Sequence, residues 1–233
     1  MIGTMDFFDR VQSVRRRIQT ACEQAQRNVS SVRLVGVTKY IGPVELAELY
    51  RAGVREFGEN RLQVAKPKLE AARVNHWKDV TWHFIGQLQT NKVKEVLREF
   101  TWIHSLDRWP LALEVNKRAQ ELGLRVPCLL QINVSGEETK AGLAANEALS
   151  FLEAAHSLSH IQVCGLMTMA PRADVPEEIR YVFRGLRELR DHLQSAGHAG
   201  IQELSMGMSQ DFEAAILEGA TIVRIGQTLL PDR

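Results

Sequence analysis

The stretch Leu34-Val35-Gly36-Val37-Thr38-Lys39 decides the fold of this chain. Aliphatic and β-branched residues crowd positions 32–38, and Gly42-Pro43 separates them from a helix-like segment at 44–52. The pattern predicts a buried strand over residues 33–39, then a short loop and a helix. A lysine at the end of a buried strand is either solvated at the rim or desolvated for chemistry, because burial lowers the pKa of an ammonium group. This stretch alone leaves both possibilities open.

The same unit of strand, loop and helix recurs along the chain. Strands are expected over residues 33–39, 54–57, 81–85, 102–105, 126–134, 161–169, 202–206 and 221–225. Helices are expected over residues 44–52, 61–72, 91–99, 109–122, 146–157, 177–196 and 211–218. This alternation predicts right-handed crossovers and a parallel sheet. Eight apolar strands favour a closed (β/α)8 TIM barrel over a doubly wound open sheet.

Residues 6–26 precede this pattern and have the apolar spacing of an amphipathic helix. We expect this helix, within residues 1–30, to pack on the outside of the barrel. The chain contains no long linker, low-complexity segment or internal repeat. Residues 1–233 are therefore predicted to form a single domain.

Composition disfavours several classes of function. Lysine and arginine number 29 against 28 acidic residues, so the net charge of +1 offers no broad basic surface for nucleic acid or an anionic membrane. Hydropathy never sustains the roughly 18 apolar residues that a membrane span needs, and the N-terminus lacks the pattern of a secretory leader. Cys22, Cys128 and Cys164 lie far apart, which disfavours a metal centre. We expect a soluble, cytoplasmic protein without a bound metal.

The loops after the seventh and eighth strands predict an anion site. Residues 205–211 pass from a strand into a helix, with Ser209 expected as the N-cap, and Gly207 frees the backbone there from a Cβ constraint. N–H groups at such a helix start attract anions, and barrels most often bind phosphate at these two loops. The second loop is Arg224-Ile225-Gly226-Gln227. Such loops also cap helices without binding a ligand, so it is the joint placement of the two that favours phosphate.

A lysine on the first strand that faces a phosphate site indicates a cofactor with both an aldehyde and a phosphate. Pyridoxal 5′-phosphate (PLP) has both groups, and Lys39 would be its Schiff-base partner. Ile222, Arg224 and Gly226 share one face of the last strand by parity. The guanidinium of Arg224 could therefore reach the pyridine nitrogen.

Motifs over nearly the whole chain resemble the YggS/PROSC family of pyridoxal-phosphate-binding proteins, also called pyridoxal phosphate homeostasis proteins. The matching runs are Val37-Thr-Lys39, Phe57-Gly-Glu-Asn60, Trp82-His-Phe-Ile-Gly-Gln-Leu-Gln-Thr-Asn-Lys92, Gly165-Leu-Met167, Leu204-Ser-Met-Gly-Met-Ser209 and Val223-Arg-Ile-Gly226. The third run is long and unusual, so the resemblance is specific.

The resemblance implies a barrel like the N-terminal domain of alanine racemase, with PLP held on Lys39 as an internal aldimine. It implies that the other cofactor-binding residues are Asn60, Met167, Ser205, Met206, Gly207, Arg224, Gly226 and Gln227. Within this set Arg224 would lie at the ring nitrogen, and the 205–207 and 226 positions would surround the phosphate. Many relatives have Thr or Ser where this chain has Gln227, so a hydroxyl contact is replaced there by the backbone N–H.

The function that we expect is PLP homeostasis: the protein would hold PLP, regulate its free level and hand it to PLP-dependent apoenzymes, with little or no turnover. A PLP-dependent amino-acid racemase and a barrel enzyme acting on a phosphorylated metabolite are the alternatives. A racemase of this type needs a second base, and Tyr40 is expected to point to the strand face opposite Lys39. We therefore predict no catalytic residues. A monomer is expected.

Two further side chains are candidates for a role at the site. His83 lies between Trp82 and Phe84 on a strand, which predicts a packed, hydrogen-bonded residue and not a base. Lys140 follows the fifth strand and is a second lysine that could take up PLP or touch its phosphate.

Overall fold

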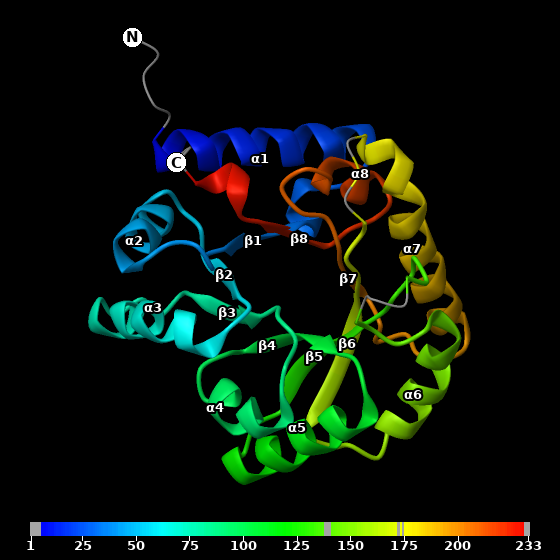
Figure 1. Ribbon diagram of the computed structural model, residues 1–233. Helices are drawn as coiled ribbons and strands as arrows, with labels where there is room; N and C mark the ends of the chain where they lie inside the picture. The colour runs from blue at the N-terminus through cyan, green and yellow to red at the C-terminus, as the bar shows by residue number, and fades with distance from the viewer. Residues whose placement is uncertain (1–5, 138–140, 172, 174, 231–233) are drawn as a thin grey trace.

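The computed structural model describes residues 6–137, 141–171, 173 and 175–230, and its strands form a closed parallel barrel (Figure 1). The strands are β1 Arg33–Val37, β2 Glu56–Glu59, β3 Thr81–Phe84, β4 Trp102–Leu106, β5 Val126–Gln131, β6 Ile161–Met167, β7 Glu203–Ser205 and β8 Ile222–Ile225. Strand β8 pairs with β1, with Arg224 opposite Val35. The predicted (β/α)8 barrel is confirmed, and this pairing excludes the open sheet.

Helices surround the barrel on its outside, as Figure 1 shows. They are α1 Phe7–Gln24, α2 Pro43–Arg51, α3 Leu62–Val74, α4 Val93–Leu97, α5 Trp109–Leu122, α6 Ala148–Ala155, α7 Arg180–Ser195 and α8 Phe212–Leu217. Short 3-10 helices cover Val29–Ser31, Thr90–Lys92, Ala145–Glu147, Pro176–Ile179 and Gln227–Leu229. The helices expected at 91–99 and 146–157 therefore begin with a 3-10 turn.

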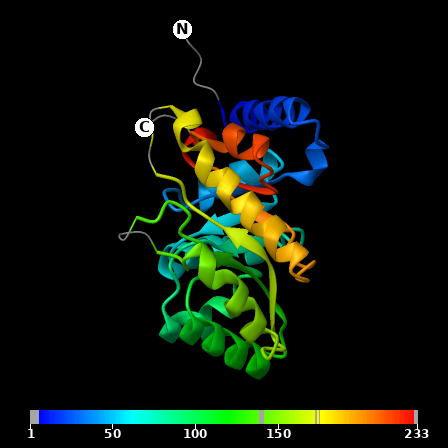
Figure 2. The ribbon, with the colours of Figure 1, turned by 90° about the vertical axis from the view of Figure 1, so that its right-hand side faces the viewer.

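The expected N-terminal helix is present as α1. The side chain of Asp6 caps it by accepting a hydrogen bond from Asp9 N–H at 2.8 Å. Its buried face packs beside α8 at the edge of the barrel, where both helices lie together in Figures 1 and 2. Arg17 of α1 makes an ion pair of 2.5 Å with Glu213 and lies over the ring of Phe212. Helix α1 thus holds the helix that follows β7.

Several strand ends differ from the prediction: β5 was expected over 126–134 and ends at Gln131, β6 was expected over 161–169 and ends at Met167, and the ends of β1 and β2 differ for identifiable reasons. Strand β1 ends at Val37, and Lys39 and Tyr40 lie in a turn, although Thr38 N–H still donates to Gly58 O at 3.1 Å. The turn begins here because Gly42 caps α2, with Glu45 accepting its N–H at 3.0 Å. Strand β2 was expected over 54–57 but begins at Glu56, because Val54 N–H closes the end of α2 by donating to Leu49 O.

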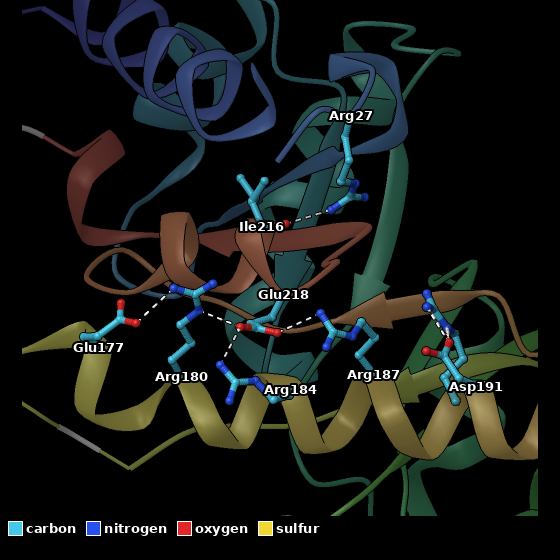
Figure 3. Close-up of polar contacts among 9 residues, drawn as sticks. Arg27, Glu177, Arg180, Arg184, Arg187, Asp191, Ile216 and Glu218 are labelled. Atoms are coloured by element: carbon cyan, nitrogen blue, oxygen red, sulfur yellow. Dashed lines mark hydrogen bonds and ion pairs between the residues drawn. The ribbon is translucent and has the colours of Figure 1, made fainter. Parts of the chain in front are cut away.

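A cluster of arginines attaches α7 to the end of α8. Glu218, which is 3% exposed, forms ion pairs with Arg180 at 2.5 Å, Arg184 at 3.3 Å and Arg187 at 2.8 Å (Figure 3). Burial acts to raise the pKa of Glu218, but the arginine hydrogen bonds and charges outweigh it and lower that pKa. Arg27 adds a hydrogen bond of 2.9 Å to Ile216 O. The connection between α8 and β8 is therefore fixed from two sides.

We expect Glu218→Gln to lower the free energy of unfolding by about 1.5–3 kcal/mol, the value of hydrogen bonds to a charged group. Glu177→Gln is the matched control, because Glu177 also pairs with Arg180 but is 68% exposed, and its loss should cost below about 1 kcal/mol. Urea denaturation measures both. A lowered carboxyl pKa stabilises above the unfolded pKa, so the Glu218→Gln deficit should shrink as pH falls below about 4. Equal effects for the two variants would contradict this assignment.

Candidate functional site

Lys39 lies half-buried at the C-terminal end of the barrel, in the turn that follows β1. Its ammonium is 4.8 Å from the centroid of the Tyr40 ring, a cation–π distance. The expectation that Tyr40 points away from Lys39 is wrong, because strand parity does not apply in a turn. The end of β8 lies alongside, since a Cβ on Gly226 would be 3.3 Å from Cβ of Val37. Barrel closure thus brings the lysine loop and the Gly226 loop together.

A fully buried ion pair supports the lysine loop from behind. Lys68 of α3 is 1% exposed and forms an ion pair with Glu59 of β2, and its ammonium also donates to Thr38 O at 2.6 Å. The Thr38 hydroxyl donates to the same Glu59 oxygen at 2.5 Å. The hydroxyl and the carbonyl of Thr38, the residue before Lys39, are therefore both held by buried charges.

Arg224 lies inside the barrel and is 4% exposed. Its guanidinium donates to Ser205 Oγ at 2.6 Å and to Thr168 O at 3.0 Å. Burial lowers the pKa of Arg224 to about 10, although the charge of Asp211 opposes that shift. Arg224 therefore stays protonated at neutral pH and is held in one place by two acceptors.

The loop after β7 requires a glycine where the sequence places Gly207, but it lacks the expected N-cap. Gly207 has φ +91°, and a Cβ there would lie 2.7 Å from Cβ of Ala215, so only glycine fits. Ser209 is not the N-cap of α8, because Asp211 takes that position and accepts from Met208 N–H at 2.5 Å. Ser209 Oγ instead accepts from Gly226 N–H at 3.2 Å, which joins the β7 and β8 loops.

The other predicted site residues lie around the same end of the barrel. Met167 is 1% exposed and packs in the barrel interior. Met206 belongs to the outer core, and its backbone N–H already donates to Ile222 O at 3.1 Å. Asn60 follows β2 and lies so close to Gly86 that a Cβ on that glycine would be 2.3 Å from Asn60 O. Gln227 is exposed beside Gly226. Lys140 lies outside the described residues.

The interior also contains polar residues that the sequence analysis did not assign to the site. His83 was expected to be packed and hydrogen-bonded, and it is fully buried, with Nδ1 3.0 Å from Nε2 of His104. Nδ1 of His104 lies 2.9 Å from Ser205 Oγ. Strand parity was the available signal for His104, because Trp102 and His104 are two residues apart and therefore share one face of β4. In the structure that face is the interior one, where Trp102 also packs. Ser205 is thereby bonded to Arg224 and His104, and not to the loop amides.

The described ranges contain neither a metal-binding cluster nor a membrane-spanning helix. No group of three or more His, Cys, Asp or Glu side chains in those ranges could hold a metal ion. Within the same ranges, no helix is long and apolar enough to cross a membrane.

The geometry defines a class of protein: parallel (β/α)8 barrels with a lysine just after the first strand and an arginine on the last strand. A glycine directly after the last strand lies against the end of the first. The family model for the alanine racemase N-terminal domain matches residues 11–232. A pyridoxal phosphate homeostasis protein of Aquifex aeolicus is 45% identical over 98% of this chain and 99% of the relative. The chain belongs to this family of pyridoxal phosphate homeostasis proteins, which is built on the alanine racemase N-terminal domain.

Solved structures agree with this placement. A protein of unknown function from Bifidobacterium adolescentis superposes with a TM-score of 0.90 at 38% identity, covering 96% of this chain and 94% of that chain. PipY of Synechococcus elongatus, solved with PLP bound, has a TM-score of 0.79 at 35% identity and covers 91% of this chain and 99% of that chain.

We expect Lys68→Met to lower the free energy of unfolding by about 3–5 kcal/mol, because it leaves the Glu59 carboxylate buried without a partner. Lys66→Met on the same helix is the control. Lys66 is 60% exposed and its ion pair with Glu95 is long, at 3.5 Å, so this substitution should change the free energy of unfolding by less than about 0.5 kcal/mol. Chemical denaturation checks both values. A Lys68→Met protein as stable as the control would show that Glu59 is not buried as a charge.

Proposed function

We propose that this chain binds PLP through Lys39 and serves PLP homeostasis with little or no catalytic turnover. The observation that carries the proposal is the juxtaposition of the Lys39 turn with Arg224 and the Gly226 loop across the β1–β8 pair. A relative named as a homeostasis protein and a related structure solved with PLP support the same ligand. The amine of Lys39 would condense with the aldehyde of PLP and release water.

The β7 and β8 loops are the proposed phosphate site. In the described part of the chain, no hydrogen bond leaves the backbone N–H of Gly207, Ser209 or Gln227. Backbone donors gathered at one place attract a phosphate. Gly226 N–H and Ser209 Oγ can turn from their mutual bond of 3.2 Å towards the same anion. A phosphate would also compensate the buried charge of Arg224 from nearby.

Arg224 is proposed as the partner of the pyridine nitrogen, with Asn60 and Met167 beside the ring. A guanidinium that stays protonated donates a hydrogen bond and leaves the ring nitrogen unprotonated. An unprotonated ring withdraws electrons weakly, so a carbanion next to it gains little stabilisation. This suits a protein that holds PLP better than one that breaks Cα–H bonds.

Holding and releasing PLP needs access to the cofactor. Around the site the exposed residues include Tyr40 at 63%, Met208 at 37% and Met169 at 42%. We propose that PLP leaves through this side to apoenzymes, from a protein that acts as a monomer and as one domain.

The position of Tyr40 is the observation that favours the alternative function, an amino-acid racemase. Its ring lies next to the Lys39 ammonium, where a phenol could serve as a second base. The exposure of Tyr40 argues against that role, since proton abstraction at carbon benefits from exclusion of water.

The first expected result is that purified protein incubated with PLP absorbs in the visible range, and that borohydride fixes the adduct on the peptide containing Lys39. Lys39→Ala should abolish the fixed adduct, while Lys92→Ala, at a side chain 38% exposed and paired with Glu95, should retain it. Pyridoxal without phosphate should bind at least about tenfold more weakly, or about 1.4 kcal/mol. Mass spectrometry of the reduced peptides measures the site. An adduct of equal yield on Lys140 would overturn the assignment to Lys39.

The second expected result is poor turnover. In deuterium oxide, PLP-loaded protein should exchange the Cα–H of L-alanine and other L-amino acids no faster than free PLP at the same concentration. Nuclear magnetic resonance measures the exchange. Exchange well above that level, lost in Lys39→Ala and strongly reduced in Tyr40→Phe, would favour the racemase.

A further inference from the structure

A line of polar side chains crosses the barrel interior and ends on Arg224. Glu56 of β2 lies 2.9 Å from Nε2 of His83, and His83 lies 3.0 Å from His104. His104 lies 2.9 Å from Ser205 Oγ, which accepts from Arg224 at 2.6 Å. The line starts at the N-terminal mouth of the barrel, where Glu56 is 22% exposed, and it reaches the side that carries the cofactor site.

We propose that every proton in this line points from Arg224 towards Glu56, so that Glu56 and the two histidines position the guanidinium through Ser205. The inference concerns residues of this chain alone. Its consequence for PLP rests on the proposed function, because Arg224 is the proposed partner of the pyridine nitrogen.

The direction follows from counting donors and acceptors, starting at Glu56. A carboxylate can only accept, so Nε2 of His83 must carry its proton. A neutral imidazole has one N–H, which leaves Nδ1 of His83 as an acceptor, and Nε2 of His104 must then donate to it. Nδ1 of His104 is left as an acceptor for the Ser205 hydroxyl. The Ser205 oxygen is then free to accept from Arg224, and each donor between Arg224 and His83 meets an acceptor. The Nε2–H of His83 faces the Glu56 carboxylate at 2.9 Å, although the angle at this contact is not that of a hydrogen bond.

This assignment of donors and acceptors requires that both histidines are neutral, and their burial favours the neutral form. Both rings are 0% exposed. Burial lowers the pKa of His83 although Glu56 opposes the shift, and burial, followed by the charges of neighbouring residues, lowers that of His104 further. The charged groups that face the line are Arg33, Glu56, Glu203, Arg224 and, next to Arg224, Asp211. Arg33 pairs with Glu56 at 3.6 Å and with Glu203 at 3.2 Å, which places a cation beside both carboxylates.

The opposite direction has a specific cost. With the protons on Nδ1 of both rings, a lone pair of His83 would face the Glu56 carboxylate at 2.9 Å. Ser205 Oγ would also accept twice and keep its own proton for another acceptor. The proposed direction therefore commits the Ser205 hydroxyl to the histidine line, and leaves phosphate binding to the backbone of the loops.

The first test is the tautomeric state of the full-length protein without PLP. We expect nitrogen-15 shifts to show both rings as Nε2–H tautomers from about pH 8 down to about pH 6, across the range where a solvated histidine titrates. The two rings are assigned by the signals that disappear in His83→Gln and His104→Gln. An Nδ1–H tautomer or an imidazolium at either ring would overturn the proposal.

The second test compares two isosteric substitutions at the same mouth of the barrel. Glu56→Gln replaces the charged acceptor of the line. Glu203→Gln neutralises the other acidic partner of Arg33, which contacts neither His83 nor His104. Because charge-assisted bonds are about twice as strong as neutral ones, Glu56→Gln should shift the tautomer ratio at least about tenfold and move the guanidinium resonances of Arg224. Glu203→Gln should leave both unchanged. Unchanged Arg224 signals in Glu56→Gln, or equal shifts in the two variants, would refute the inference.

PLP titration separates this inference from the proposed function. If wild-type protein fails to bind PLP but the tautomers and the Arg224 response are as described, the proposed function falls and the inference stands. If PLP binds, its absorption maximum or its Kd should change in Glu56→Gln by more than in Glu203→Gln. A bound spectrum and a Kd that are equal in the two variants would show that the line does not reach the cofactor.

Discussion

The pairing of β8 with β1 is the constraint on which the site depends. The register places Arg224 opposite Val35, and it brings Gly226 against Val37 immediately before the Lys39 turn. Nearly two hundred residues separate Lys39 from Gly226, so no local propensity could hold them together. Closure fixes them because a parallel barrel has no free edge, and each strand's position is set by its two neighbours.

Closure also decides where charge can be buried. The interior contains an apolar group formed by Val35, Leu129, Met167 and Ile222. Arg224 is the charged side chain that lies almost fully buried inside the barrel, and its positive charge is only partly compensated by Asp211. An isolated buried charge is costly, so the site is electrostatically suited to an anionic ligand. The proposed phosphate binding therefore draws on the charge of the barrel as well as on the shape of the loops.

Much of this arrangement could be predicted from the sequence, because it follows from periodicity. The apolar runs and glycine-proline breaks gave the order of strands and helices, and parity placed Arg224 and Gly226 on one face. Strand ends were less predictable, since the extent of β1 depends on where Gly42 and Glu45 start the next helix. The Glu59–Lys68 pair was not foreseen, because a charged pair at helix and strand positions has the same sequence pattern as solvated residues. Ser209 failed as an N-cap because Asp211 competes for the same turn.

The contrast between Lys39 and Lys68 shows how one fold gives two lysines different tasks. Lys68 is buried in an ion pair with Glu59, and breaking such a pair is strongly destabilising, so its role is structural. Lys39 follows the residue that Lys68 holds, yet among the described residues no carboxylate lies within ion-pair distance of it. An amine attacks an aldehyde through its nitrogen lone pair, so a lysine outside any carboxylate pair is the better placed of the two for the proposed bond to PLP. The buried pair therefore fixes the backbone of the turn that carries Lys39, the lysine to which we propose that PLP attaches.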